Sequence, residues 1–221
     1  MNIFEIIGPV MVGPSSSHTA GACRIGYICS RLLGEKIEFA EIGLYGSFLS
    51  TGKGHGTQQA LVAGLLGMKP DDSNIPCSFE IAKNVGLSFE IKAAKLRDAH
   101  PNSVSLFLRG TSGKELNIVA ESIGGSIINI ASVDGLNANF SGDYPTLIIN
   151  NTDVPGMLSA VSDKLSENNI NIANMQLYRA SRGKNAVLII ESDQEIPREI
   201  IEAIKNTKGI NKVSYLSLEE V

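Results

Sequence analysis

Apolar positions in the first 70 residues predict two helices with a strand between them. The helices are expected over residues 20–33 and 57–66, and the strand over residues 39–45. A loop rich in glycine and hydroxyl residues precedes each helix, over residues 8–19 and 46–56. The same plan, in which such a loop leads directly into a helix, therefore occurs twice.

Residues 78–140 alternate between apolar and polar positions, which is typical of short strands. We expect them to form a mainly antiparallel sheet on which the two helices pack, giving an α+β first domain. The order of the strands cannot be derived from one sequence. The expected strands run through Phe79, Ile81 and Val85, through Leu87, Phe89 and Ile91, and over residues 104–108, 116–120 and 127–133.

Turn-forming residues gather at 141–145, and we place the domain boundary there, giving domains 1–143 and 144–221. The second domain reads as strand, helix, strand, strand, helix, strand, which is the ferredoxin-like βαββαβ order. Its helices carry apolar residues at helical spacing, and Pro197 opens the second of them. The expected strands cover residues 146–150, a segment ending near 178, 186–190 and 212–218; the helix positions are Leu158, Val161, Leu165, Ile200, Ile201 and Ile204.

The apolar alternation slips within the second strand of this domain. Ile170 and Ile172 share one face, whereas Ala173, Met175 and Leu177 share the opposite one. Because side chains alternate with a period of two, this slip predicts a β-bulge near Ala173.

Residues 186–190 are apolar on both faces of the sheet, although the two helices cover only one. The other face needs cover, which a second domain of this kind or the first domain of the same chain could supply. Pairing between copies would make the protein a homodimer or a larger assembly.

The net charge of −4, the lack of a basic cluster and the absence of tryptophan argue against a nucleic-acid partner. The N-terminus has no basic region of the kind that opens a signal peptide, and no apolar stretch is long enough to span a bilayer. We therefore expect a cytoplasmic protein with no membrane partner.

The three cysteines, Cys23, Cys29 and Cys77, are too few and too scattered for a disulfide framework. Three thiolates could hold an iron-sulfur cluster with one open iron. However, Cys23 and Cys29 lie six positions apart on one expected helix, which turns them roughly 240° from each other, and no Cys-x-x-Cys motif is present. Ordinary small core residues are the favoured interpretation.

The loop before the first helix is a candidate anion site. The first backbone N–H groups of a helix lack intrahelical acceptors and the helix dipole is positive there, so a carboxylate or phosphate is favoured. An ordinary N-cap is the alternative, since serine and threonine are preferred caps, but a cap requires only one of these side chains. The side chains available there are Ser15, Ser16, Ser17, His18 and Thr19.

All three histidines, His18, His55 and His100, lie in loops of small residues, where a titrating side chain can meet a substrate proton. Gly54 and Gly56 would let a ligand approach the backbone beside His55. The segment from Gly46 departs from a nucleotide-binding P-loop in spacing and in the residue after the lysine, so nucleotide binding is rejected. No His-x-x-x-His pair exists for zinc.

Three motifs together, residues 13–21, 52–57 and 100–103, closely resemble the β chain of bacterial iron-sulfur L-serine dehydratase, in order and in spacing. The C-terminal part resembles an ACT domain, so the resemblance covers nearly the whole chain. It implies deamination of L-serine to pyruvate and ammonia with a [4Fe-4S] cluster held by a separate α chain, not by this one. One iron would bind the serine hydroxyl as a Lewis acid while a base removes the Cα proton.

The resemblance also implies residue roles at an active site completed at the interface with the α chain, in an α2β2 or similar assembly. His55 is the candidate base, although the sequence does not decide which histidine takes the proton. The other expected contacts are His18, Ser15, Ser16, Ser17 and Thr19 around the substrate carboxylate, Gly54 beside His55, and His100 with Asn102 in support.

A second hypothesis is a regulatory module without catalysis. First domains of this kind also resemble the substrate-sensing domain of some phosphoglycerate dehydrogenases, and ACT domains bind amino acids or simply dimerise. The resemblance assigns effector binding to the loop that contains Asn151, Asp153, Val154, Pro155, Gly156 and Met157. An amino acid, a cation and dimerisation alone all stay open for that loop.

Overall fold

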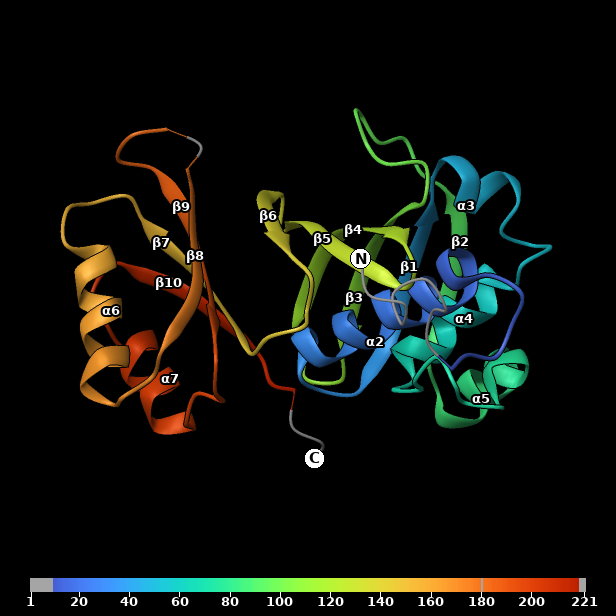
Figure 1. Cartoon of the computed structure of the whole chain (residues 1–221), viewed down its shortest axis with the longest axis horizontal. Coiled ribbons are helices and arrows are strands. Elements are labelled where there is room, and N and C mark those ends of the chain that lie inside the picture. The colour runs from blue at the N-terminus through green and yellow to red at the C-terminus, as the bar shows by residue number, and fades with distance from the viewer. Residues whose placement is uncertain (1–9, 180, 219–221) are drawn as a thin grey trace. The chain divides into compact units, whose positions relative to one another are not determined.

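The computed structural model describes residues 10–179 and 181–218. The chain divides into two compact units, Met1–Gly135 and Leu136–Val221 (Figure 1). This division falls earlier than the boundary expected at residue 143, which lies in the segment between strands β6 (Leu136–Phe140) and β7 (Thr146–Thr152). The exact domain boundary stays a prediction.

The larger sheet has six strands in the order β2-β1-β3-β4-β5-β6. The expectation of a mainly antiparallel sheet holds for β1 with β3, β3 with β4, and β4 with β5, but β1 and β2 pair in parallel. The strands are β1 (Ile37–Leu44), β2 (Ser88–Ala93), β3 (Ser103–Gly110), β4 (Glu115–Gly124), β5 (Ile127–Val133) and β6 (Leu136–Phe140).

Helices α2 and α4 pack against each other and α2 lies on β4, so these helices cover one face of the sheet (Figure 1). Val104, Leu106 and Leu108 alternate along β3 and are buried beneath them. The helical elements of this unit are η1 (Ser16–Gly21), α2 (Ala22–Leu33), α3 (Gly46–Ser50), α4 (Thr57–Leu65), η2 (Ile75–Cys77) and α5 (Ser78–Val85).

The strand expected through Phe79 and Val85 is wrong, because these residues form helix α5. Ser78 and Ala82, four residues apart, face the interior, which is helical spacing. Phe79 packs on Phe89 of β2 with ring centroids 5.0 Å apart. A short apolar run does not distinguish helix from strand by its periodicity. Here the contacts of Ser78, Ala82 and Phe79 with the rest of the unit favour the helix.

The second unit contains the expected βαββαβ order, with an antiparallel sheet ordered β10-β7-β9-β8 and both helices on one face (Figure 1). The bulge is confirmed, since the pairing of β8 with β9 shifts register between Ile172 and Asn174. The elements are β7 (Thr146–Thr152), α6 (Met157–Glu167), β8 (Ile172–Arg179), β9 (Asn185–Ser192), α7 (Arg198–Lys205) and β10 (Ile210–Leu216).

The core of the second unit lies between its sheet and its helices. Leu147 and Ile149 of β7 and Leu188 and Ile190 of β9 point into it and are buried. On the other face Val187 and Ile189 are also buried. Among the described residues, no helix combines the length and the apolar character needed to cross a membrane.

Candidate active site

The serine run forms the first turn of a helix, where the sequence led us to expect a loop. Ser15 is the N-cap, and its side-chain oxygen accepts from the His18 amide at 3.0 Å. The Ser15 carbonyl accepts from the amides of both Thr19 and Ala20, at 2.9 and 3.2 Å. The second of these bonds spans five residues, so η1 is a π-helical turn, a form that often marks functional sites.

The β4–β5 hairpin supports this turn. The Ser126 hydroxyl donates to the Ser16 carbonyl at 3.2 Å. A Cβ at Gly21 would lie 2.2 Å from the Ser122 hydroxyl, so glycine lets η1 lie directly on β4. The β4–β5 hairpin therefore holds the turn that carries His18 in place.

His18 and His55, 37 positions apart, lie side by side. Their ring centroids are 5.0 Å apart. The Thr19 hydroxyl donates to the His55 carbonyl at 2.8 Å, which ties the two loops to each other. Thr19 is only 2% exposed, so its position suits this tie better than the ligand contact that the sequence suggested.

Helix α3 supplies two further hydroxyls that the sequence analysis missed. His18 Nε2 lies 3.0 Å from Ser47 Oγ and 3.1 Å from Thr51 Oγ1. Phe48, between them in sequence, meets the His18 ring edge-on at 5.4 Å. The spacing of four between Ser47 and Thr51 places both hydroxyls on one helix face and was the available signal. We call His18, Ser47, Thr51 and His55 the histidine site.

The orientation of the His55 ring follows from one hydrogen bond. Its Nδ1 lies 3.0 Å from the Thr51 carbonyl oxygen, which can only accept. Nδ1 therefore carries the proton, and in the neutral ring Nε2 keeps a lone pair. A lone pair on a half-buried ring is what a general base needs.

The environment of His18 favours its neutral form. Burial lowers the pKa of His18, and the nearby His55 lowers it further, while a hydrogen bond with the Ser47 backbone raises it. The net direction is downward from the ordinary value of 6.5.

The third motif borders the histidine site. The Ser47 amide donates to the Pro101 carbonyl at 2.7 Å, and Asn102 Nδ2 donates to the Ser122 carbonyl at 3.3 Å. The Asn102 amide donates to His100 Nδ1 at 3.2 Å, so a neutral His100 carries its proton on Nε2. All three motifs of the sequence thus meet within the first unit.

The glycines around His55 differ in what they contribute. Gly56 caps α4 with a positive φ of 68°, a conformation that other residues rarely adopt. A Cβ at Gly54 would meet only the Thr51 carbonyl, at 3.6 Å, so space does not require glycine there. A Cβ at Gly52 would lie 2.1 Å from the Phe48 carbonyl, which makes Gly52 the position where no side chain fits.

The cysteines of this chain do not fit an iron-sulfur cluster. Cys23 and Cys29 are buried in α2, and burial raises the pKa of Cys23 to about 12 and raises that of Cys29 as well, so both stay thiols. Cys77 is exposed at the end of η2. Over residues 10–179 and 181–218, no three His, Cys, Asp or Glu side chains group in a way that could hold a metal.

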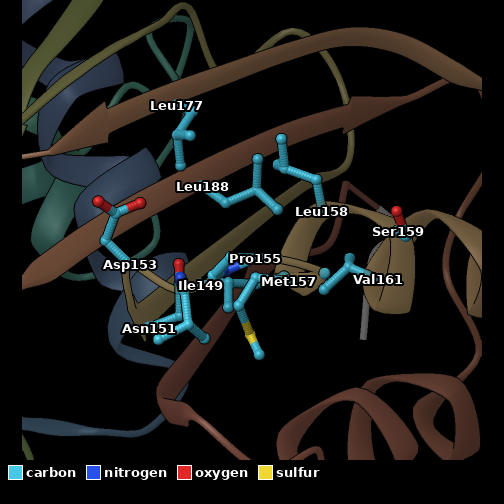
Figure 2. A pocket seen from close by; sticks show the side chains of 12 residues that line it. Ile149, Asn151, Asp153, Pro155, Met157, Leu158, Ser159, Val161, Leu177 and Leu188 are labelled. Atoms are coloured by element: carbon cyan, nitrogen blue, oxygen red, sulfur yellow. The ribbon is translucent and has the colours of Figure 1, made fainter. Parts of the chain in front are cut away.

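The second unit contains a cavity of about 250 Å³ beside the start of α6 (Figure 2). All six residues of the expected effector loop line it. Apolar side chains from β7, β8, β9 and α6 complete the wall, including Leu177, Leu188 and Val161. Asp153 at its rim accepts from the Gly183 amide at 3.1 Å and pairs with Arg179 at 3.3 Å.

Two families of known proteins match different parts of the chain. Residues 2–95 match the family described as serine dehydratase beta chain, and residues 146–209 match the ACT domain. The chain is 36% identical over 216 residues to an L-serine dehydratase beta chain of Peptoniphilus asaccharolyticus, covering 97% of each chain. It is also 36% identical to a probable L-serine dehydratase beta chain of Bacillus subtilis, covering 98% of each.

A D-3-phosphoglycerate dehydrogenase of Bacillus subtilis is 26% identical over 201 residues, which are 89% of this chain but 37% of the dehydrogenase. The two beta chains match at higher identity and from end to end. Because of these matches over nearly its full length, this chain belongs to the family of L-serine dehydratase beta chains.

Proposed function

We propose that this chain is the β subunit of an L-serine dehydratase that converts L-serine to pyruvate and ammonia together with an α chain. The observation that carries the proposal is the pairing of His18 and His55 at 5.0 Å beside the N-terminus of η1. A proton acceptor and an anion-binding helix end, side by side, suit removal of a proton next to a carboxylate. The relatives named above as beta chains support the same reaction.

In this proposal the substrate carboxylate lies at the start of η1. The first amides of a helix lack intrahelical acceptors and point toward such an anion. Ser16 and Ser17 are half-buried there, and the Ser15 hydroxyl, which accepts from His18, still has its own proton to donate. The His100–Asn102 loop would border the other side of this carboxylate site.

His55 is the proposed base, because the hydrogen bond from its Nδ1 to the Thr51 carbonyl leaves a lone pair on Nε2. It would take the Cα proton of serine. The substrate hydroxyl would leave as the α chain draws electron density from it. We assign the [4Fe-4S] cluster to the α chain, since the cysteines of this chain do not fit it. Its role when bound is to act as a Lewis acid toward the substrate hydroxyl.

The test is His55→Ala in protein co-expressed anaerobically with its α chain, assayed for pyruvate from L-serine, D-serine and L-threonine. If His55 is the base, kcat falls by about 10² or more while KM changes little. Lys53→Ala, an exposed position in the same loop, is the matched control and should retain full turnover. Unchanged kcat in the His55 variant, or activity of the β chain without its partner, would contradict the proposal.

The cavity of the second unit favours a second role, binding of a small effector by the ACT domain. Its lining by all six expected loop residues is the supporting observation. Met157→Phe would fill the cavity and should shift the dependence of turnover on serine concentration without lowering the maximal rate. Val85→Phe, an exposed position in the other unit, is the control. Identical saturation curves for both variants would rule this role out.

A further inference from the structure

Thr51, at the C-cap of α3, contacts both histidines through different atoms. Its hydroxyl lies 3.1 Å from His18 Nε2, and its carbonyl lies 3.0 Å from His55 Nδ1. The sequence motifs did not predict a role for Thr51. Within residues 10–179 and 181–218, it is the one residue that hydrogen-bonds to the ring nitrogens of both histidines.

The proton of the Thr51 hydroxyl has its best partner elsewhere. Thr51 Oγ1 lies 2.9 Å from the Ser47 carbonyl oxygen, which can only accept, so the hydroxyl donates there. Its contact with His18 then requires the ring nitrogen to be the donor. Ser47 Oγ, 3.0 Å from the same nitrogen, accepts equally well. A neutral His18 therefore carries its proton on Nε2 and its lone pair on Nδ1.

The Thr51 carbonyl gives His55 the opposite arrangement. This oxygen accepts from His55 Nδ1 and also from the Gly54 amide, at 3.1 Å. The hydrogen bond from the Gly54 amide holds this carbonyl against the loop that carries His55, so the imidazole has a fixed acceptor. A neutral His55 therefore carries its proton on Nδ1 and its lone pair on Nε2.

We propose that Thr51 is a positioning residue that holds His18 and His55 in opposite tautomers, so that only His55 offers an Nε2 lone pair to the substrate. This inference rests on the proposed function, because it explains why one histidine of the pair acts as the base. Thr51 itself touches no reacting atom in this arrangement. It acts through the two rings.

The first test reads the tautomers directly on the full-length wild-type chain. Long-range ¹H–¹⁵N spectra of the imidazole nitrogens, recorded above the histidine pKa range, distinguish Nδ1–H from Nε2–H rings. We expect Nε2–H for His18 and Nδ1–H for His55. The same tautomer on both rings would overturn the proposal, whatever the chain catalyses.

The second test uses Thr51→Val, which removes the hydroxyl but keeps the shape and the carbonyl. The His18 ¹⁵N signals should change while those of His55 stay close to wild type. In the complex with the α chain, kcat should fall between about 10- and 100-fold, as for a misplaced catalytic group, with KM within about twofold. Thr51→Ser restores the hydroxyl and should recover both the signals and kcat.

Ser50→Ala is the matched control, because Ser50 is the preceding exposed residue of α3. Thr51→Val signals and kcat indistinguishable from those of Ser50→Ala would overturn the positioning role. If the tautomers are as expected but the wild-type complex makes no pyruvate from serine, the proposed function fails while the arrangement of the rings stands.

Discussion

His18 and His55 lie close enough that two positive charges on their rings would repel each other. Burial adds to this cost at His18, whose pKa is lowered from its ordinary value. The folded state therefore holds His18 neutral at pH values where the unfolded chain begins to bind a proton. The stability of the first unit should depend on pH for this reason.

The sign of that dependence follows from proton binding. Around and below pH 6.5 the unfolded state binds more protons at His18 than the folded state, so the free energy of unfolding falls as the pH is lowered. His18→Gln keeps a side-chain N–H donor for Ser47 and Thr51 but does not titrate. Urea unfolding at pH 7.5 and 5.5 should show a smaller loss of stability in this variant than in wild type. An equal loss in both would contradict the assignment.

At the residue scale the sequence identified His18, His55 and the serine run because each is a local motif. The sequence did not predict a role for Ser47 and Thr51, because that role depends on their contact with a histidine about 30 positions earlier in the chain. Hydroxyl residues on a short helix have many ordinary uses, and only the folded arrangement shows what they face.

At the scale of elements, the histidine site depends on how α2 and α4 cross. A Cβ at Gly64 would lie 2.0 Å from the Cys23 carbonyl and 2.6 Å from the Tyr27 amide. A Cβ at Gly26 would lie 2.3 Å from the Leu61 carbonyl. The two backbones are therefore in direct contact, and η1 with His18 and the loop with His55 lead into these same two helices.

Gly64→Ala should destabilise the protein by about 1–3 kcal/mol, because the added methyl group forces the two helices apart. Helix propensity alone would favour alanine by about 1 kcal/mol, so a measured loss identifies the close contact as the cause. Urea unfolding gives the value. Gly54→Ala, where the added group meets one atom at 3.6 Å, is the control and should be near neutral. Stabilisation by Gly64→Ala would contradict the crossing.

The elements show where periodicity suffices and where it fails. The bulge of β8 was predictable because alternation over eight residues leaves no doubt about which face each side chain takes. Helix α5 was not, because apolar residues at 79, 81 and 85 suit either structure. The start of η1 was placed too late, since serine and histidine have weak helix propensity and a π-helical turn has no simple sequence signature.

At the scale of the whole molecule, each of the two units has its own core. Leu165 of α6 is fully buried in the core of the second unit, whereas Leu158 of the same helix is 40% exposed. A cavity at Leu165 should loosen the second unit without affecting the first.

Leu165→Ala should cost about 2–5 kcal/mol in the second unit. Hydrogen exchange followed by mass spectrometry should show faster exchange in β7 and β9, with α2 and β3 unchanged. Leu158→Ala is the control and should leave exchange near wild type in both units. Equal acceleration across the whole chain would show that the two units unfold as one.

The fold of the second unit was predictable because its element order already specifies a known arrangement, each strand pairing antiparallel with its neighbours. The order of the first sheet was not, because β2 returns beside β1 in parallel after four helical elements, α3, α4, η2 and α5. Such a long-range pairing leaves no trace in local periodicity.

The π-helical turn of η1 makes the position of the His18 ring depend on the length of the serine run. Loss of a single residue between Ser15 and His18 would turn the imidazole by roughly a quarter of a turn around the helix axis, away from α3. Exchange of Ser17 for another small residue would leave the ring where it is. We therefore expect the position of the His18 ring to survive substitution of Ser17 by a small residue but not deletion of a residue from this run.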